Sequence, residues 1–175
     1  MRHRFVTLLL LAAPLVAFGL PARQLAAQGP SAPPKVPLLE RLVGRWTMTG
    51  TVRGKPASYR LDADWTLQHR YVELHMVDAM HTPPGYEARV LIGPDTSDGR
   101  VIAHWLDNTG AAFSVPPGTG AARGDTLVID FPYPDGAFHD RFVLDRRTKA
   151  WTVTLDADDG KGGTSRFAEY HVSPR

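Results

Sequence analysis

Ten short runs of alternating apolar and polar residues follow one another along this chain, and no other feature limits its fold as strongly. Residues two apart lie on the same face of a β-strand, so each run predicts a strand with one apolar face. The clearest such face carries Tyr59, Leu61, Ala63, Trp65 and Leu67. The predicted strands cover residues 44–54, 57–67, 70–80, 85–93, 99–107, 111–116, 125–132, 137–145, 149–157 and 164–172.

The breaks between these runs are rich in Gly, Pro, Asp and Asn, residues that supply the backbone angles and side-chain caps of tight turns. Short connections between successive strands predict an antiparallel meander. Ten such strands close most simply into a barrel, because closure removes both exposed edges. The sequence therefore predicts an all-β protein with a single antiparallel up-and-down β-barrel of about ten strands. Leu38, Leu39 and Leu42 have helical spacing and predict one short helical turn before Gly44.

The first 27 residues have the three parts of a secretory signal peptide. A basic start at Arg2 and Arg4 precedes an apolar run from Phe5 to Leu20, and small residues follow up to Ala27. The apolar run is shorter than the roughly 20 residues that span a membrane. We therefore predict cleavage before Gln28, export to the periplasm or medium, and no stable membrane span afterwards; an uncleaved anchor is the alternative. Residues 28–37 are a proline-rich, mobile lead, and residues 38–175 form the barrel domain.

Charge and cysteine content exclude several classes of function. The chain has 20 Lys+Arg against 18 Asp+Glu, and three of the arginines lie in the signal peptide, so the mature domain is close to neutral. Its arginines alternate with aspartates instead of forming the concentrated basic face that phosphate contacts need, which argues against nucleic-acid binding. The chain has no cysteine, which excludes disulfides, thiolate metal sites and cysteine nucleophiles.

The apolar faces of the predicted strands are heavy in aromatic residues. Large aromatics on the inner side of a barrel can form the wall of a cavity for a small, largely apolar ligand. The alternative is that they only fill the interior, as in a structural envelope protein. The aromatic residues that we predict as ligand-binding are Trp46, Trp65, Trp105, Phe138, Phe142 and Tyr170.

Asp140 lies between Phe138 and Phe142 in the alternation, on a face that should point inward. A buried carboxylate needs a partner or a shifted pKa. Arg166 shares a face with Tyr170, so we predict an interior Asp140–Arg166 pair as the polar contact of the pocket. The alternative is a bulge that turns Asp140 outward.

Catalytic and metal motifs are absent from the sequence. It has no Gly-x-Ser-x-Gly elbow and no His-Glu-x-x-His sequence, so we predict neither catalytic residues nor metal ligands. His69, His75 and His81 are six residues apart, about 20 Å along a strand, and neighbours so far apart cannot share one ion. An enzyme on the same barrel, a hydrolase or isomerase, would have to use Asp140 with His104.

A series of short motifs resembles those of the lipocalin-like secreted bacterial family called domain of unknown function 1579. The order is Leu42-Val43-Gly44-Arg45-Trp46, Gly85-Tyr86, Gly93-Pro94-Asp95, His104-Trp105-Leu106-Asp107-Asn108, Gly124-Asp125-Thr126-Leu127 and a final Glu169-Tyr170. The resemblance covers about residues 38–173 and implies a calycin-type barrel. It brings no established activity or substrate.

Two looser resemblances concern ligands. The last strand is similar to that of fatty-acid-binding proteins, but Arg166 and Tyr170 are more widely spaced than their Arg-x-Tyr motif, which puts a carboxylate clamp in doubt. The ten-stranded haem barrels of the nitrobindin type bind haem through a late histidine. That resemblance implies His171 as the haem ligand, whereas the residues by themselves predict no cofactor.

Overall fold

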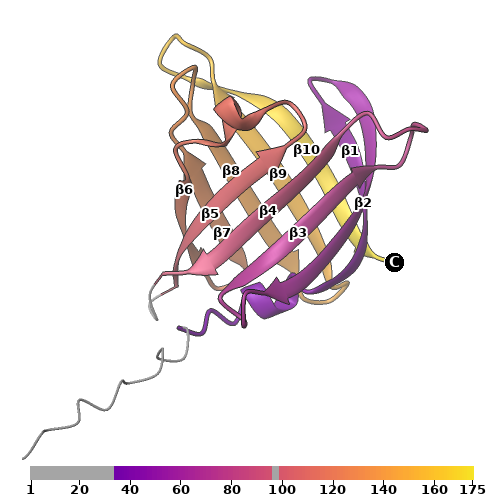
Figure 1. Cartoon of the computed structure of the whole chain (residues 1–175), viewed down its shortest axis with the longest axis vertical. Helices are drawn as coiled ribbons and strands as arrows, with labels where there is room; N and C mark the ends of the chain where they lie inside the picture. Colours follow the sequence, from indigo (N-terminus) through magenta and orange to yellow (C-terminus); the bar gives the residue numbers. More distant parts are fainter. Residues whose placement is uncertain (1–33, 96–98) are drawn as a thin grey trace, which may run out of the picture. The chain divides into compact units, whose positions relative to one another are not determined.

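The computed structural model describes residues 34–95 and 99–175, which form a closed antiparallel β-barrel (Figure 1). Each strand pairs with the next along the chain, and the last strand pairs with the first. The fold class predicted from the alternation is therefore confirmed. The ten strands are β1 (Gly44–Val52), β2 (Lys55–Thr66), β3 (Tyr71–Asp78), β4 (Glu87–Pro94), β5 (Arg100–Asp107), β6 (Gly118–Arg123), β7 (Thr126–Phe131), β8 (Phe138–Asp145), β9 (Ala150–Asp158) and β10 (Thr164–Pro174).

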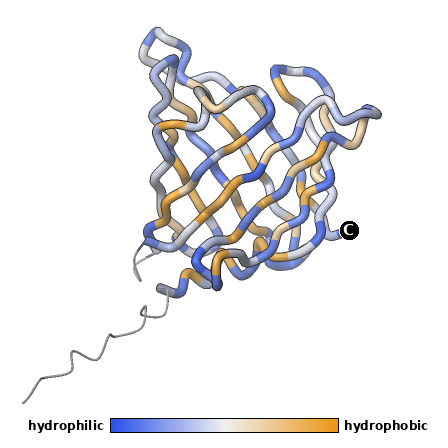
Figure 2. The backbone as a smooth tube through the Cα atoms, in the orientation of Figure 1, coloured by the Kyte–Doolittle hydropathy of each residue, from blue (hydrophilic) through white to orange (hydrophobic). Residues whose placement is uncertain are grey.

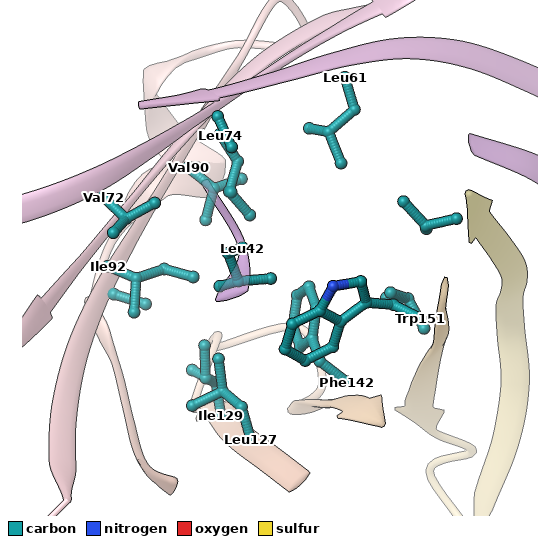
Figure 3. Packing of buried hydrophobic residues seen from close by; sticks show 14 of the residues in the cluster. Leu42, Leu61, Val72, Leu74, Val90, Ile92, Leu127, Ile129, Phe142 and Trp151 are labelled. Atoms are coloured by element: carbon teal, nitrogen blue, oxygen red, sulfur yellow. The ribbon is translucent and has the colours of Figure 1, made fainter. Parts of the chain in front are cut away.

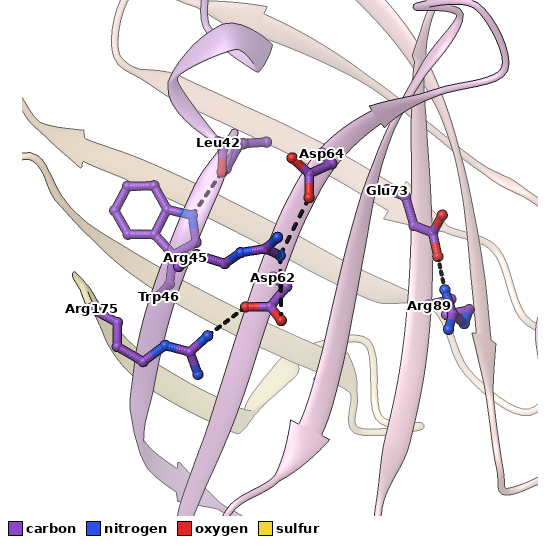
Figure 4. A network of polar contacts seen from close by, with 8 residues as sticks. All are labelled: Leu42, Arg45, Trp46, Asp62, Asp64, Glu73, Arg89 and Arg175. Carbon is purple, nitrogen blue, oxygen red and sulfur yellow. Dashed lines mark hydrogen bonds and ion pairs between the residues drawn. The ribbon is translucent and has the colours of Figure 1, made fainter.

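The alternation along each strand separates a buried inner face from an exposed outer face (Figure 2). In β3, for example, Val72, Leu74 and Met76 are buried while the residues between them are half-buried on the outside. The outer face carries ion pairs between neighbouring strands, such as those of Arg45 with Asp62 and Asp64 (Figure 4). Burial of the inner rows supplies the main driving force for the fold.

A 3-10 turn, η1 (Leu39–Arg41), closes one end of the barrel, as the leucine spacing predicts. Leu39 and Leu42 are buried, and the indole nitrogen Nε1 of Trp46 donates a hydrogen bond to the Leu42 carbonyl at 2.8 Å (Figure 4). Val36, which we assigned to the mobile lead, is also buried, and its carbonyl accepts a hydrogen bond from the Leu39 N–H. The packed domain therefore begins before residue 38.

One predicted strand is wrong. The run 111–116 contains a second 3-10 turn, η2 (Ala111–Ser114), and the sixth strand is instead β6, in a segment that we predicted to be a break. Gly118 and Gly120 look like turn residues, but here they allow β7 to approach closely. A Cβ on Gly118 would lie 2.7 Å from the Phe131 ring. Close packing therefore selects glycine within this strand.

The predicted signal peptide and most of the predicted lead lie outside the described residues. Among the residues that the structure describes, no helix has the length and hydrophobicity needed to cross a membrane.

Candidate functional site in the barrel interior

The interior has a closed apolar end and a polar end. The apolar end is covered by η1. The connections between β3 and β4, β5 and β6, β7 and β8, and β9 and β10 all lie at the opposite end, which we call the loop end (Figure 1). Three acidic side chains belong to inward-facing rows there: Asp78 on β3, Asp107 on β5 and Asp140 on β8.

A small cavity lies in the middle of the barrel. Its volume is about 20 Å³, which is room for about one water molecule. The lining includes Trp46, Met48, Met76, Trp105, Phe142 and Trp151. Side chains therefore fill most of the interior.

Trp151 brings a polar atom into this apolar region. Figure 3 shows its indole ring beside Phe142, with the nitrogen edge toward the space between Leu42 and Leu61. Nε1 of Trp151 is buried and has no hydrogen-bond partner in the described part of the chain. A buried donor without an acceptor costs about 1–3 kcal/mol, so this nitrogen is a position where a ligand acceptor would be stabilising.

Three tyrosines pack edge to face near the loop end. The ring centroids of Tyr59 and Tyr86, and of Tyr59 and Tyr170, are 5.8 Å apart. The Tyr170 hydroxyl is a hydrogen-bond partner of the Tyr59 hydroxyl. Burial raises the pKa of all three phenols above the usual value, so all remain neutral hydroxyls at physiological pH.

A hydrogen-bond chain fixes one side of this cluster. Trp105 Nε1 donates to the Tyr86 hydroxyl at 3.0 Å, and that hydroxyl donates to Asp107 Oδ2 at 2.9 Å. Thr109 N also donates to the other Asp107 oxygen at 2.9 Å. These groups therefore have their own partners and form a rigid polar wall.

Asp78 organises the connection between β3 and β4. Its carboxylate accepts hydrogen bonds from the backbone N–H groups of Met80 at 2.8 Å and Gly85 at 3.0 Å, and His81 Nδ1 lies 2.6 Å away. The two backbone hydrogen bonds lower the pKa of Asp78 to about 2. Asp78 is therefore an ionised group at the loop end that holds the loop in place.

Asp140 differs from both of the other inward-facing acids. It is only 2% exposed, and its Oδ1 atom has no hydrogen-bond partner among the described residues. We call this atom the orphan oxygen. Burial raises the pKa of Asp140 to about 8, so the group is largely protonated at neutral pH. Burial raises the pKa of Tyr133 and Tyr170, and the charge of an ionised Asp140 adds a smaller increase, so both phenols lie within electrostatic reach of it.

The predicted interior pair of Asp140 and Arg166 does not form. A β-bulge shifts the register of β10 against β9 between Arg166 and Ala168, which reverses the alternation at that point. Arg166 lies on the outer surface, where its guanidinium pairs with Asp156 at 2.6 Å and Glu169 at 2.7 Å. The alternative, a bulge that turns Asp140 outward, is also wrong, because the bulge lies in β10 and Asp140 points inward.

The other predicted site residues are not all brought together. Trp46, Trp105 and Phe142 line the cavity, while Tyr170 belongs to the tyrosine cluster. Phe138 is half-buried at the loop end, with its ring 5.0 Å from that of Phe167. Trp65 lies at the closed end, where its Nε1 donates to Glu40 at 2.9 Å, and takes no part in the site.

The sequence-based site lacks four residues that the structure places in or beside it. Tyr59 and Trp151 lie in the same inward-facing rows as predicted core residues. The alternation along their strands therefore indicates that both side chains point inward. Tyr86 and Tyr133 precede and follow strands, where alternation gives no signal. The residues missed by the prediction are Tyr59, Tyr86, Tyr133 and Trp151.

The histidines do not support the enzyme or haem alternatives. His104 lies on the outer face beside Tyr71, with ring centroids 6.5 Å apart, whereas Asp140 points inward, so the two do not meet. His171 is exposed between the buried residues Tyr170 and Val172. The position that nitrobindin-type barrels use for haem therefore does not fit a haem inside this barrel. Within the described ranges, no three His, Asp or Glu side chains are grouped as metal ligands would be.

Comparisons with known proteins support the fold. No family model matches the sequence, and no curated protein matches it, so membership of the family called domain of unknown function 1579 stays a prediction. A similar solved structure is that of Rv2717c from M. tuberculosis, with a TM-score of 0.57 and 11% sequence identity. The similarity covers 80% of this chain and 98% of that chain. This chain therefore folds as a closed up-and-down barrel of ten antiparallel strands that is similar in fold to Rv2717c.

Proposed function

We propose that this protein is an exported barrel, related to the secreted family called domain of unknown function 1579, that binds a small, largely apolar ligand inside its loop end. The observation that carries the proposal is the orphan oxygen of Asp140, a polar atom buried in the interior without a partner in the described chain. Buried polar groups in folded proteins are almost always hydrogen-bonded. Exceptions concentrate at functional sites, where a ligand completes the hydrogen bonding.

The ligand enters where the interior can adapt. The cavity of about 20 Å³ holds one water, so a larger molecule must displace side chains. Met48 and Met76 line the cavity, and methionine side chains repack more readily than branched or aromatic ones. Tyr133 and Phe138 are half-buried at the loop end and form its aromatic rim. This arrangement supports entry of slender, unbranched molecules from the loop end.

Binding can be tested with a series of straight-chain alcohols from n-propanol to n-octanol. We expect a saturable change in tryptophan fluorescence, because Trp46, Trp105 and Trp151 border the cavity. Each added methylene should tighten binding by roughly fourfold until the site is full, since burial of a methylene contributes about 0.8 kcal/mol. The measurement is made on Trp65→Phe protein, because Trp65 lies at the closed end and would add an unrelated signal.

A linear, unsaturated response to every alcohol would contradict the proposal. It would favour the second candidate, a structural envelope protein with a filled interior, which the small volume of the cavity supports. The melting temperature separates the two candidates independently. A ligand that binds the folded state raises it, whereas an alcohol that binds no site lowers it by solvating the unfolded chain.

Export makes a separate prediction about the N-terminus. We expect protein expressed from the full sequence to be recovered outside the cytoplasm, beginning at Gln28, because residues 1–27 have the form of a cleaved signal peptide. Cell fractionation with intact-mass measurement tests this, and a chain that starts at residue 28 after an initiating methionine serves as the cytoplasmic control. Full-length protein in the membrane fraction would instead support the uncleaved anchor.

A further inference from the structure

We infer that the ligand carries a basic nitrogen, held as an ammonium group between the Asp140 carboxylate and the aromatic rings at the loop end. This inference rests on the proposed function and specifies the class of ligand. It follows from three features of the interior: the sign of its charges, the arrangement of its rings and the hydrogen-bonding capacity of the orphan oxygen.

The first feature is that the inward-facing charges at the loop end are all acidic. Asp78, Asp107 and Asp140 come from three different strands and converge on this end. Among the residues that the structure describes, no lysine or arginine is buried. Arg166, the one basic residue that we predicted inside, is paired with Asp156 and Glu169 on the outer surface. Inside the barrel a ligand carboxylate would therefore meet only acidic side chains, whereas a cation is attracted. The exposed guanidinium of Arg53 lies outside this interior, 5.0 Å from the centroid of the Phe167 ring.

The second feature is a continuous series of aromatic rings beside Asp140. Phe131 stacks on Tyr133 at 5.5 Å, and Tyr133 meets Phe138 edge to face at 6.2 Å. Phe131 also meets Trp105 at 6.3 Å, which joins the series to the wall of the cavity. The negative faces of such rings attract an organic cation, and the attraction strengthens when the cation is removed from water. An alcohol or a fatty acid makes no equivalent contact.

The third feature is the hydrogen bonding of Asp140. An ammonium group has donors and no acceptor, and the orphan oxygen is an acceptor with no donor among the described residues. The nearby phenols do not fill this role, because the Tyr170 hydroxyl partners Tyr59 and the Tyr86 hydroxyl donates to Asp107. A bound ammonium would satisfy the oxygen and also pair the buried charge, which is how ionised carboxylates are stabilised in protein interiors.

Three ligands of equal chain length test the inference: n-hexylammonium chloride, n-hexanol and sodium n-hexanoate. Dissociation constants are measured by tryptophan fluorescence and calorimetry at constant ionic strength. We expect hexylammonium to bind at least about tenfold more tightly than hexanol, and hexanoate to bind more weakly than both. In Asp140→Asn the preference for hexylammonium over hexanol should be lost, while hexanol binding persists. Asp64→Asn, which removes an exposed carboxylate on the outer face, should leave the preference unchanged.

A pair of rim variants tests the aromatic contribution. Tyr133→Leu should weaken hexylammonium binding several-fold more than hexanol binding, and Tyr133→Phe, which keeps the ring, should restore it. Saturable binding of hexanol without any preference for hexylammonium would overturn this inference and leave the proposed function intact. Preference for hexanoate would overturn it as well. No saturable binding of any of the three would contradict the proposed function itself.

Discussion

Asp140→Asn protein is expected to be more stable than the unmodified protein at pH 8, and the difference should disappear near pH 4. The native pKa of Asp140 is about 8, whereas an unfolded aspartate titrates near 3.9. Between these values the unfolded chain loses a proton that the folded protein keeps, so stability falls as pH rises. The free energy of unfolding of the unmodified protein should fall by on the order of 5 kcal/mol across this interval, which is a large part of the stability of an ordinary domain.

The measurement is urea denaturation at intervals from pH 4 to pH 8 for both proteins. Titrating groups remote from Asp140 contribute equally to both curves and cancel in the difference, whereas the charge of the neighbouring His139 lowers the pKa of Asp140 and is coupled to it. Asp64→Asn removes an ion pair that is largely exposed and should give a difference that varies little with pH. If the difference in free energy of unfolding between the two proteins stayed constant from pH 4 to pH 8, Asp140 would be ionised and partnered in the native protein. That result would contradict the geometry described above.

Gly120→Ala is expected to destabilise the barrel by about 3 kcal/mol or more, because the added methyl group meets backbone and not a movable side chain. A Cβ at this position would lie 1.9 Å from the Val128 carbonyl oxygen. Gly120 pairs with Ile129 in the register of β6 and β7, so relief of the clash must separate the two strands. Chemical denaturation measures the loss as a lower midpoint with an unchanged slope.

Gly85→Ala is the matched control for this substitution. Its Cβ would lie 3.4 Å from Asp78 Oδ2, an ordinary contact, and we expect a change within about 0.5 kcal/mol. If Gly120→Ala were as stable as this control, the close approach of β6 and β7 would be contradicted. Loss of pairing in β6 would also open two edges in a sheet that otherwise has none.

The architecture could be predicted from the sequence because burial of one face imposes a period of two on every long strand. The same rule failed for β6, where Gly118 and Gly120 carry no side chain to show a period and their spacing from β7 depends on tertiary contacts. Turn-like composition therefore concealed a strand. Only the position of the neighbouring strand shows whether a glycine belongs to a turn or lies in a strand where it allows close packing.

The candidate site could be predicted only in part. Alternation correctly placed Asp140 inside, because β8 is regular from Phe138 onward. The same alternation placed Arg166 inside too, and a single bulge reversed it. A bulge depends on the fit between two strands and leaves no periodic mark in one of them. Its effect was to replace the predicted Asp140–Arg166 pair by an isolated acid, which adds a basic nitrogen to the small, largely apolar ligand that the sequence predicts.

Closure of the barrel depends on one ladder that differs from all the others. Nine pairs of neighbouring strands are consecutive in the chain, whereas β1 and β10 bring together opposite ends of the domain, from Trp46 opposite Pro174 to Val52 opposite Ala168. Each hairpin closes only a short loop, whereas formation of the β1–β10 ladder has the entropy cost of closing a loop that contains nearly the entire domain. Without this ladder, β1 and β10 are edge strands whose unpaired backbone groups can pair with other chains. We therefore expect substitutions in β1 or β10 to slow folding more than equally destabilising changes in the turns.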